Sequence, residues 1–581
     1  MAERLDRYRT TLKSRIQELP LAGLFLWLAP VAFLGVFYFY PLGTILGISL
    51  GRGEGNLAPF AEALASASIR RVVWFTIWQA GLSTFLTLLF GLPGAYLLAR
   101  FDFRGKALIQ ALTGIPFILP TLVVATAFNA LLGPRGWVNL ALMEFFDLAQ
   151  PPIQFVNSLT AILVAHVFYN TTIVLRMVGD FWSHLDPRLT QAAQVLGANR
   201  WRTLLNVTLP LLMPAIVTAA LLVFIFDFTS FGVILVLGGP HYATLEVEIY
   251  YQTISLFNLP LAAVLSILQL ACTLGLTILY SRLSLRMSRP ITLRPRRYTQ
   301  RRLLSWRSRL TAGVLIVLLL GLLTTPLAAL ATRSFMSVET SRRGQPPTAH
   351  FTLDYYRELP INRQNSLFYV PPSTAIAVSL SYAAITVLLA LGLGLPASWA
   401  LSHRPDSPLS RVFDPLLMLP LGTSAVTLGL GFIVALDHPP LDLRASILLV
   451  PIAHTLVAFP FVVRSLTPAL RSIRPRLRQA AAVMGANPRQ VLRHIDLPLI
   501  GRALLVAAVF AFTISLGEFG ATALIARPEY PTVPVMIYRF ISQPGALNYG
   551  RALALSTLLM VVAAGGMLAI ERFRIADIGE F

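Results

Sequence analysis

The sequence predicts an all-α polytopic membrane protein built as two tandem six-helix halves, with about 12 transmembrane helices in all. Of its 581 residues, 56% are hydrophobic and only 13% are charged, and the mean hydropathy is +0.69. Such a composition indicates a membrane protein and not a soluble globular domain. The apolar residues also gather in runs of the roughly 20 residues that a bilayer requires. Finally, a polar motif of the first half recurs in the second half at a constant offset of 288 residues, which indicates an internal duplication.

Twelve apolar runs are candidate membrane spans. They cover residues 21–48, 72–99, 107–132, 159–182, 213–237, 260–284, 311–335, 373–401, 411–436, 445–464, 503–526 and 548–571. The first run is long enough to span and has no small-residue cleavage site, so we expect a retained helix and not a signal peptide.

The basic residues alternate with the spans. The net charge of +21 is carried almost wholly by arginine, and basic stretches occur in the N-terminal segment and in every second loop, as the positive-inside rule requires of cytoplasmic segments. We therefore expect both termini in the cytoplasm of a multi-pass protein of the plasma (inner) membrane. The segment 336–372 should face outside, partly ordered, with one short helix. Because the positive charge flanks the apolar runs, we expect membrane lipid and no nucleic acid as its partner.

The duplication divides the chain into two halves. The first half takes residues 1–284 with a core of about 68–284, and the second takes 311–581 with a core of about 373–571. Between them, residues 285–310 are rich in arginine and should form a cytoplasmic linker. Since six spans separate the copies, equivalent loops face the same side, and the halves should be related by an axis along the membrane normal.

The repeated motif is a polar loop, and it predicts a short helix on the cytoplasmic face. Residues 188–211 and 476–499 are identical at 13 of 24 positions. The shared positions that we single out are Gln191, Ala192, Ala193, Gly197, Leu209 and Pro210, and Gln479, Ala480, Ala481, Gly485, Leu497 and Pro498. The alanines and glycine would give one smooth helix face, the glycine would end the helix, and Leu-Pro would open the next span. Such a helix suits a partner's groove. An ordinary interfacial loop is the alternative, and recurrence on the same face disfavours it.

This motif resembles the EAA loop of permease subunits of ABC importers, although Gln191 and Gln479 replace the family's glutamate. The resemblance extends over nearly the whole chain, as two fused permease domains. It implies the type I ABC importer permease fold, with two copies of an ABC ATPase subunit docked on the loops and an extracytoplasmic solute-binding protein as partners. It also implies that ATP and Mg are bound by the ATPase and that this chain binds no cofactor.

Two further motifs point to a branch of that family. Leu237-Gly238-Gly239-Pro240, the following Ala243-Thr244-Leu245-Glu246 with Ile249-Tyr250, and Gly517-Glu518-Phe519-Gly520 are similar to fused permeases of thiamine and iron(III) importers. The resemblance therefore implies a small solute, thiamine or iron(III), and does not separate the two.

The sequence has no motif for chemistry of its own. A Walker A loop requires lysine before Ser or Thr with two spaced glycines, and neither Lys13 nor Lys106 has that context. No Cys/His cluster has metal-ligand spacing, and no catalytic triad is evident. We therefore expect a transport subunit and not an enzyme, working by alternating access. A 12-span secondary carrier driven by an ion gradient is the alternative, and it would not need paired coupling loops.

Two acids lie inside predicted spans, where a charge is costly and indicates function by default. Asp227 is in the fifth span and Glu518 in the equivalent eleventh, and they are offset by three residues within the repeat. They are the candidate translocation path for a cationic solute. The alternative is that each acid bonds to a neighbouring helix. His166 and His454 are equivalent to each other, and we expect them to make structural hydrogen bonds between helices.

Overall fold

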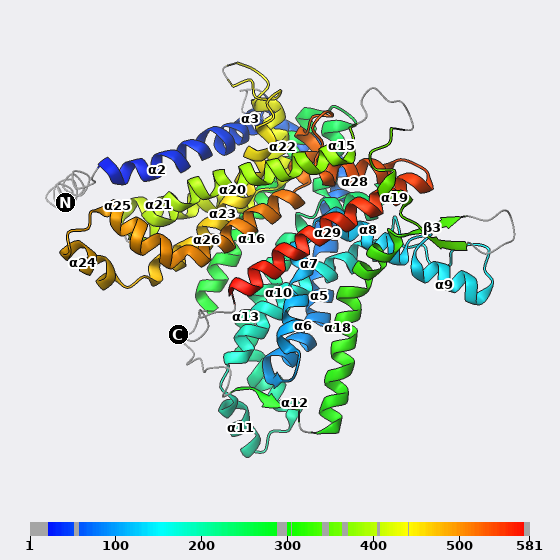
Figure 1. The fold of residues 1–581 in the computed structure, drawn as a ribbon, viewed down its shortest axis with the longest axis horizontal. Coiled ribbons are helices and arrows are strands. Elements are labelled where there is room, and N and C mark those ends of the chain that lie inside the picture. Colours follow the sequence, from blue (N-terminus) through cyan, green and yellow to red (C-terminus); the bar gives the residue numbers. More distant parts are fainter. Residues whose placement is uncertain are drawn as a thin grey trace.

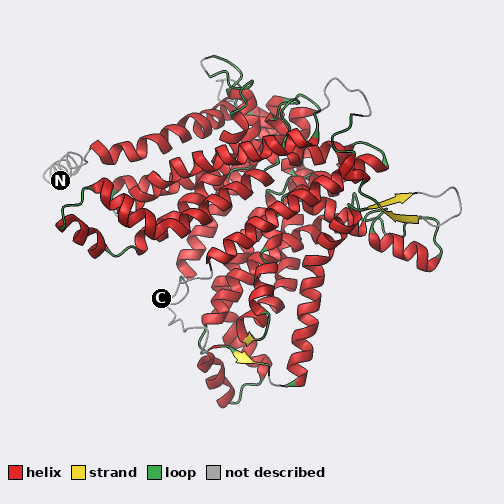
Figure 2. Ribbon diagram, viewed as in Figure 1, coloured by secondary structure: helices red, strands yellow, loops and turns green. Residues whose placement is uncertain are grey.

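The computed structural model describes residues 21–51, 57–287, 299–303, 305–339, 348–362, 370–403, 407–439 and 441–574. Helices make up most of this part of the chain, and its strands form two short pairs (Figure 2). Ten described helices are long and apolar enough to cross a membrane, or up to 12 if two bent pairs each count as one span. The predicted all-α membrane fold is confirmed.

The first half contains fifteen helices in the described residues. They are α2 (Leu21–Leu34), α3 (Tyr40–Ser49), α4 (Ala58–Ala65), α5 (Ala67–Arg100), α6 (Lys106–Leu112), α7 (Ile115–Ile118), α8 (Thr121–Leu132), α9 (Trp137–Phe146), α10 (Leu159–His184), α11 (Pro187–Val195), α12 (Arg200–Thr203), α13 (Leu209–Phe228), α14 (Gly232–Leu237), α15 (Leu245–Ile254) and α16 (Leu259–Met287). The π-helical turns η1 (Gly35–Phe39) and η2 (Leu204–Thr208) continue α2 into α3 and α12 into α13, and the 3₁₀ turn η3 (Pro240–Tyr242) precedes α15.

The second half has a similar order with fewer helices among its described residues. Its helices are α18 (Trp306–Arg333), α19 (Asp354–Arg357), α20 (Pro372–His403), α21 (Pro408–Met418), α22 (Ala425–Ala435), α23 (Leu449–Ser472), α24 (Pro475–Val483), α25 (Pro488–Val491), α26 (Leu497–Gly517), α27 (Gly520–Ile525), α28 (Val533–Ser542) and α29 (Ala546–Arg574). The 3₁₀ turn η4 (Leu419–Gly422) lies between α21 and α22, and the π-helical turn η5 (Leu492–Asp496) lies between α25 and α26.

The third and ninth spans are not the straight helices that hydropathy predicts. The chain bends by 108° between the stretch ending at Ile118 and α8, and by 97° between η4 and α22. At the first bend Pro120, which lacks an N–H, is in an extended conformation. At the second, the Ser424 hydroxyl accepts hydrogen bonds from the backbone N–H groups of Val426 and Thr427 and so begins a new helix. Because apolar residues continue through both bends, hydropathy does not detect them.

The fifth and eleventh spans are also interrupted. The predicted spans 213–237 and 503–526 each contain two helices, because α13 ends at Phe228 before α14, and α26 ends at Gly517 before α27. Both interruptions lie beside the candidate acids. The four breaks in the membrane-spanning region therefore leave backbone ends and polar side chains in the interior of the molecule.

The first helix of each half packs on the other half. In Figure 1, α2 and α3 (blue) run beside α20 and α22, and α18 (green) runs along the first half. The Tyr38 hydroxyl is 2.6 Å from that of Thr423, and the Trp27 and Phe413 rings are 4.9 Å apart. On the other side, the buried Leu319 of α18 lies against α5. This exchange of helices holds the two halves together.

The strands come from a loop of the first half, from the linker and from the segment 336–372 of the second half. The segment 336–372 contains an antiparallel pair, β3 (Met336–Glu339) with β4 (Thr348–Phe351), followed by α19. The short helix expected there is therefore present, whereas the strand pair was not predicted. The linker 285–310 is shorter than predicted, since α16 and α18 extend into it. Its β2 (Arg301–Arg302) pairs in parallel with β1 (Phe101–Asp102) of the first half.

Several predictions on charge fall outside the described residues. They concern the basic N-terminal segment, the arginines of residues 288–298 and both chain ends. The cytoplasmic location of the termini therefore stays a prediction.

The helices of the two halves converge at one end of the molecule and diverge at the other. In Figure 1, α15, α22 and α28 lie together, whereas α11 and α24 lie at the separate tips of two diverging groups of helices. Both repeated loops are thus at the divergent end, on the same side of the molecule, as the duplication predicts.

Candidate functional site

The two repeated loops each fold as a short helix ended by a glycine. In the first, Gly197 has φ +88° and donates its N–H to Gln194, while Ala198 donates to Ala193. This pair of bonds is the Schellman motif, which requires a left-handed residue, and glycine adopts that conformation without steric cost. Gly485 has φ +87° and the same two bonds are repeated at the end of α24. The predicted role of both glycines as helix ends agrees with this geometry.

The most exposed apolar side chains of these loops are not the predicted alanines. Val195 and Leu196 are 86% and 87% exposed, and their equivalents Val483 and Met484 are 89% and 81% exposed. The helix turns the second alanine inward instead, and Ala481 is buried. The sequence analysis missed the exposed pairs Val195–Leu196 and Val483–Met484. Two apolar residues directly before the glycine of an otherwise polar loop were the signal that could have revealed them. Both loops therefore present an apolar tip.

The Leu-Pro pairs begin α13 and α26, as the sequence predicts, but each of these helices continues without a break from the helical turn before it. Residues Arg200–Phe228 and Arg489–Gly517 each form a single candidate span. A π-helical turn precedes each pair, and Leu209 and Leu497 donate their N–H groups five residues back, to Leu204 and Leu492. The wider turn accommodates the proline that follows, which lacks an N–H and would clash in a regular helix.

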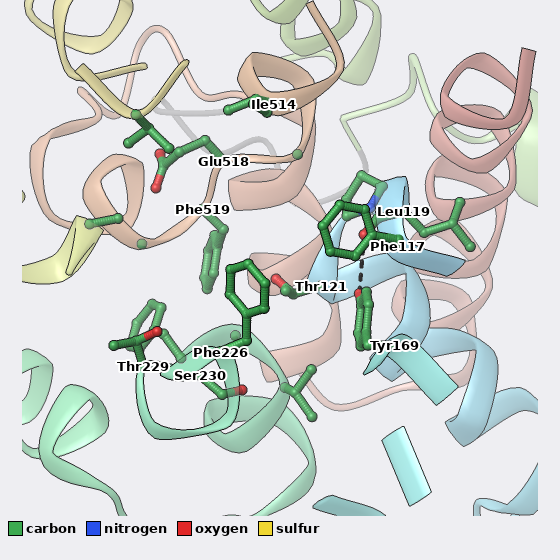
Figure 3. A pocket seen from close by; sticks show the side chains of 18 of the residues that line it. Phe117, Leu119, Thr121, Tyr169, Phe226, Thr229, Ser230, Ile514, Glu518 and Phe519 are labelled. Carbon is green, nitrogen blue, oxygen red and sulfur yellow. Dashed lines mark hydrogen bonds between the residues drawn. The ribbon is translucent and has the colours of Figure 1, made fainter. Parts of the chain in front are cut away.

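A cavity of about 370 Å³ lies between the halves, at the broken spans. The break before α8, the ends of α13 and α26 and the starts of α14, α22 and α27 all contribute to its wall. Figure 3 shows rings from both halves, Phe117, Phe226 and Phe519, around this space with Glu518 on one side. The acids in the wall are Asp227, Glu246 and Glu518, and no lysine or arginine is among the lining residues.

Both candidate acids contact the equivalent histidines. His166 Nδ1 lies 3.3 Å from Asp227 Oδ1, and its Nε2 lies 2.9 Å from the Ser230 hydroxyl. In the second half, His454 Nδ1 lies 2.7 Å from the Ser515 hydroxyl, and its Nε2 lies 3.2 Å from Glu518 Oε2.

The two histidines contact equivalent positions, but the acid and the serine at those positions are exchanged between the halves. At the offset of 288, Ser515 matches Asp227 and Glu518 matches Ser230. Each histidine therefore bridges the same two positions of its own half, and the acid occupies one position in the first half and the other in the second. The alternative that each acid bonds to a neighbouring helix is thus realised in both halves, while both acids also line the cavity.

Glu246 is a third buried acid, which the sequence analysis named only as part of a family motif and not as a candidate for the path. Its carboxylate accepts a hydrogen bond from Gln269 at 2.6 Å and from the Ser424 hydroxyl of the second half at 2.5 Å. The residue lies between two predicted spans, so hydropathy placed it outside the membrane. The fold brings α15 back into the interior, where Glu246 is only 1% exposed.

Aromatic rings form much of the apolar wall. Phe231 and Phe519 stack across the boundary between the halves with centroids 5.5 Å apart, and Phe117 and Phe226 meet edge to face at 6.0 Å. Phe231 and Phe519 are equivalent by the repeat, so the stack lies at the junction of the two halves. Such rings offer both apolar surface and a negative face for a cation.

The cavity and the loops carry side chains that are suited to binding. The described residues contain no group of three or more His, Cys, Asp or Glu side chains that could hold a metal ion. The cavity offers carboxylates, hydroxyls, imidazoles and rings, and the two loops offer apolar tips at the divergent end. This arrangement can bind a small solute at the centre and a partner protein at each loop.

Comparisons with known proteins give the family. The family model for the binding-protein-dependent transport system inner membrane component matches this sequence at residues 91–289 and 390–573, which is more than half of the chain. A thiamine transport system permease protein of Brucella abortus is 30% identical over 539 residues, covering 91% of this chain and 92% of that protein. Its counterpart in Escherichia coli K12 is 29% identical, covering 84% and 88%. A probable ABC transporter permease protein of Sinorhizobium fredii is 25% identical, covering 94% and 95%.

The family domain thus matches twice, once in each half, as the internal duplication requires. The chain belongs to the binding-protein-dependent transport system inner membrane components, as a permease of an ABC importer with two family domains fused in tandem.

Proposed function

We propose that this permease imports thiamine across the inner membrane. The observation that carries the proposal is the similarity, over about nine-tenths of both chains, to proteins described as thiamine transport system permeases. None of the three relatives named above is described as an iron(III) permease or as a carrier driven by an ion gradient.

The chemistry of the cavity supports an organic cation over ferric iron. Fe³⁺ requires a set of several oxygen, nitrogen or sulfur ligands, and the described residues contain no cluster of that kind. The cavity wall instead combines carboxylates with aromatic rings, among them Phe226, Phe231 and Phe519. Thiamine is an aromatic cation, so both parts of the wall match it.

The energy for transport would come from two ATPase subunits docked on α11 and α24. The exposed apolar tips at Val195–Leu196 and Val483–Met484 suit insertion into a groove of a partner. Both loops lie at the divergent end of the molecule (Figure 1). Closure of the ATPase pair on ATP would draw the loops together and open the convergent end towards an extracytoplasmic binding protein. In this scheme the termini are cytoplasmic, ATP and Mg are bound by the ATPase, and this chain holds no cofactor.

Uptake of radiolabelled thiamine by intact cells tests the proposal. A strain without thiamine uptake of its own would express the chain together with its ATPase and binding protein. We expect accumulation that survives collapse of the ion gradients but stops when ATP is depleted. Accumulation that depends on an ion gradient and not on the ATPase would contradict the proposal, as would uptake of ferric iron without uptake of thiamine.

A further inference from the structure

We propose that the cavity is a substrate-binding site of the permease itself, and that it holds a monovalent organic cation through one carboxylate, that of Asp227. This inference rests on the proposed function, because it names the residue that would receive the cation carried by that importer. Of the three acids in the cavity wall, it assigns one to the ligand and the other two to the structure of the protein.

Two of the three acids already have partners for both carboxylate oxygens. Glu518 Oε1 accepts from the N–H of Ala521, and its Oε2 accepts from the N–H and the hydroxyl of Thr522. These bonds fix the start of α27, so Glu518 acts as a helix cap. Glu246 is likewise occupied by Gln269 and Ser424. Both side chains are therefore committed to contacts within the protein.

Asp227 differs in having one oxygen without a partner. Its Oδ1 accepts from the Asn170 side chain at 2.7 Å and lies beside His166. Its Oδ2 makes no hydrogen bond to any described residue, although the side chain is only 1% exposed and lines the cavity. Buried polar atoms almost always have a partner, and a buried carboxylate oxygen without one is costly. A cation or an N–H donor in the cavity would supply the missing partner.

The surroundings of Asp227 favour an organic cation. The adjacent Phe226 lines the cavity with Phe117, Phe231 and Phe519, and a positive ring held among such faces is stabilised by cation–π attraction. The cavity volume of about 370 Å³ falls in the range of small-molecule sites, roughly 300–1,000 Å³. The wall contributes no lysine or arginine that would repel a cation.

The duplication does not create a second site of this kind. The position equivalent to Asp227 is Ser515, whose hydroxyl bonds to His454 and to Thr386. Among the three acids of the wall, only Asp227 has a carboxylate oxygen without a hydrogen-bond partner in the described residues, and one such oxygen matches one positive charge. The asymmetry also orients the ligand, because its charged end should lie towards the first half.

Direct binding to the purified complex tests this site. The full-length permease with its ATPase subunits would be placed in lipid nanodiscs without the binding protein. The probes are thiamine and an uncharged analogue in which carbon replaces the thiazolium nitrogen. We expect the wild type to prefer thiamine, and Asp227→Asn to weaken thiamine binding by about 10- to 100-fold, the effect of losing a charge-assisted contact. Binding of the uncharged analogue should hardly change.

Two further variants separate charge from structure. Asp227→Glu keeps the charge and should keep the preference for thiamine. Glu518→Gln should also keep the preference, even where loss of the cap lowers the amount of folded protein. The inference is overturned if the wild-type complex binds no thiamine, if Asp227→Asn retains the preference, or if Glu518→Gln abolishes it as fully.

ATP-driven thiamine uptake by the same complex in proteoliposomes distinguishes this inference from the proposed function. If the wild type imports thiamine and Asp227→Asn binds it with unchanged affinity, the proposed site is wrong but the proposed function is not. A wild-type complex that imports no thiamine overturns both.

Discussion

Replacing Gly485 with alanine tests the geometry of the second repeated loop. The glycine has φ +87°, and a Cβ atom added there would meet no atom within 4 Å. The substitution therefore causes no clash within the permease, and its cost is that of a left-handed alanine, about 1–2 kcal/mol. That energy changes the population of the native loop end by about 5- to 30-fold. The substitution would weaken the two backbone hydrogen bonds that end α24 and so hold Val483 and Met484 in their exposed positions.

We expect Gly485→Ala to lower thiamine-stimulated ATP hydrolysis and uptake, while the amount of protein in the membrane stays normal. Asparagine tolerates the left-handed conformation, so Gly485→Asn should lose less. Gly501→Ala is the matched control, because Gly501 lies within α26 and its added Cβ also meets open space, without positive φ. Gly485→Arg should uncouple the complex most strongly, since it adds a bulky charge to the docking surface.

The assay compares basal and substrate-stimulated ATPase activity with uptake in proteoliposomes. Equal losses in Gly485→Ala and Gly485→Asn would refute the argument from backbone conformation. Normal coupling in both Gly485→Ala and Gly485→Arg would refute the assignment of this loop to the ATPase.

Three other changes test separate parts of the structure. Met484→Asp should lower the ratio of ATPase to permease in a pull-down without affecting folding, because Met484 is exposed; an unchanged ratio would contradict the docking role. Glu358→Ala leaves the buried Arg551 guanidinium without its carboxylate at 3.3 Å and should destabilise the protein by about 3–5 kcal/mol, with a lower Tm in nanodiscs; an unaltered Tm would show that the pair is not structural. Tyr38→Phe removes the 2.6 Å bond to Thr423 between the halves and should cost about 1 kcal/mol, measured in the same thermal assay; a loss several times larger would mean that the bond organises the exchanged helix.

The duplication made the large-scale fold predictable. A constant offset places Gly197 and Gly485 on one face and pairs the fifth span with the eleventh, so the halves and the loops follow from the sequence. The left-handed conformation of both glycines is a local property, and local sequence predicts it well.

The breaks in the spans and the packing between helices were not predictable in this way. Hydropathy averages over a window, and it passes through Pro120 and Ser424 because their neighbours are apolar. It also placed Glu246 outside the membrane, since that method does not detect a helix that returns to the interior. The exchange of α2 and α18 between the halves depends on side-chain fit, which the apolar pattern does not encode.

The candidate site was predictable in part. Asp227 and Glu518 stood out because acids are rare within spans, and their equivalent histidines were visible from the offset. The difference between the two acids was not predictable, because it depends on the hydrogen-bond partners of each carboxylate. Glu518 caps α27 through Ala521 and Thr522, which requires the break after Gly517, and that break is not a feature of the hydropathy profile.

The central claim is tested most directly by transport with purified components. The permease, its ATPase and its binding protein would be reconstituted in proteoliposomes, and uptake of labelled thiamine would be followed with ATP, without ATP, and with an imposed ion gradient alone. The account predicts thiamine uptake that requires ATP, the ATPase and the binding protein, and that excess ferric iron does not inhibit. Uptake driven by the ion gradient alone, or no thiamine uptake from an active ATPase complex, would contradict it.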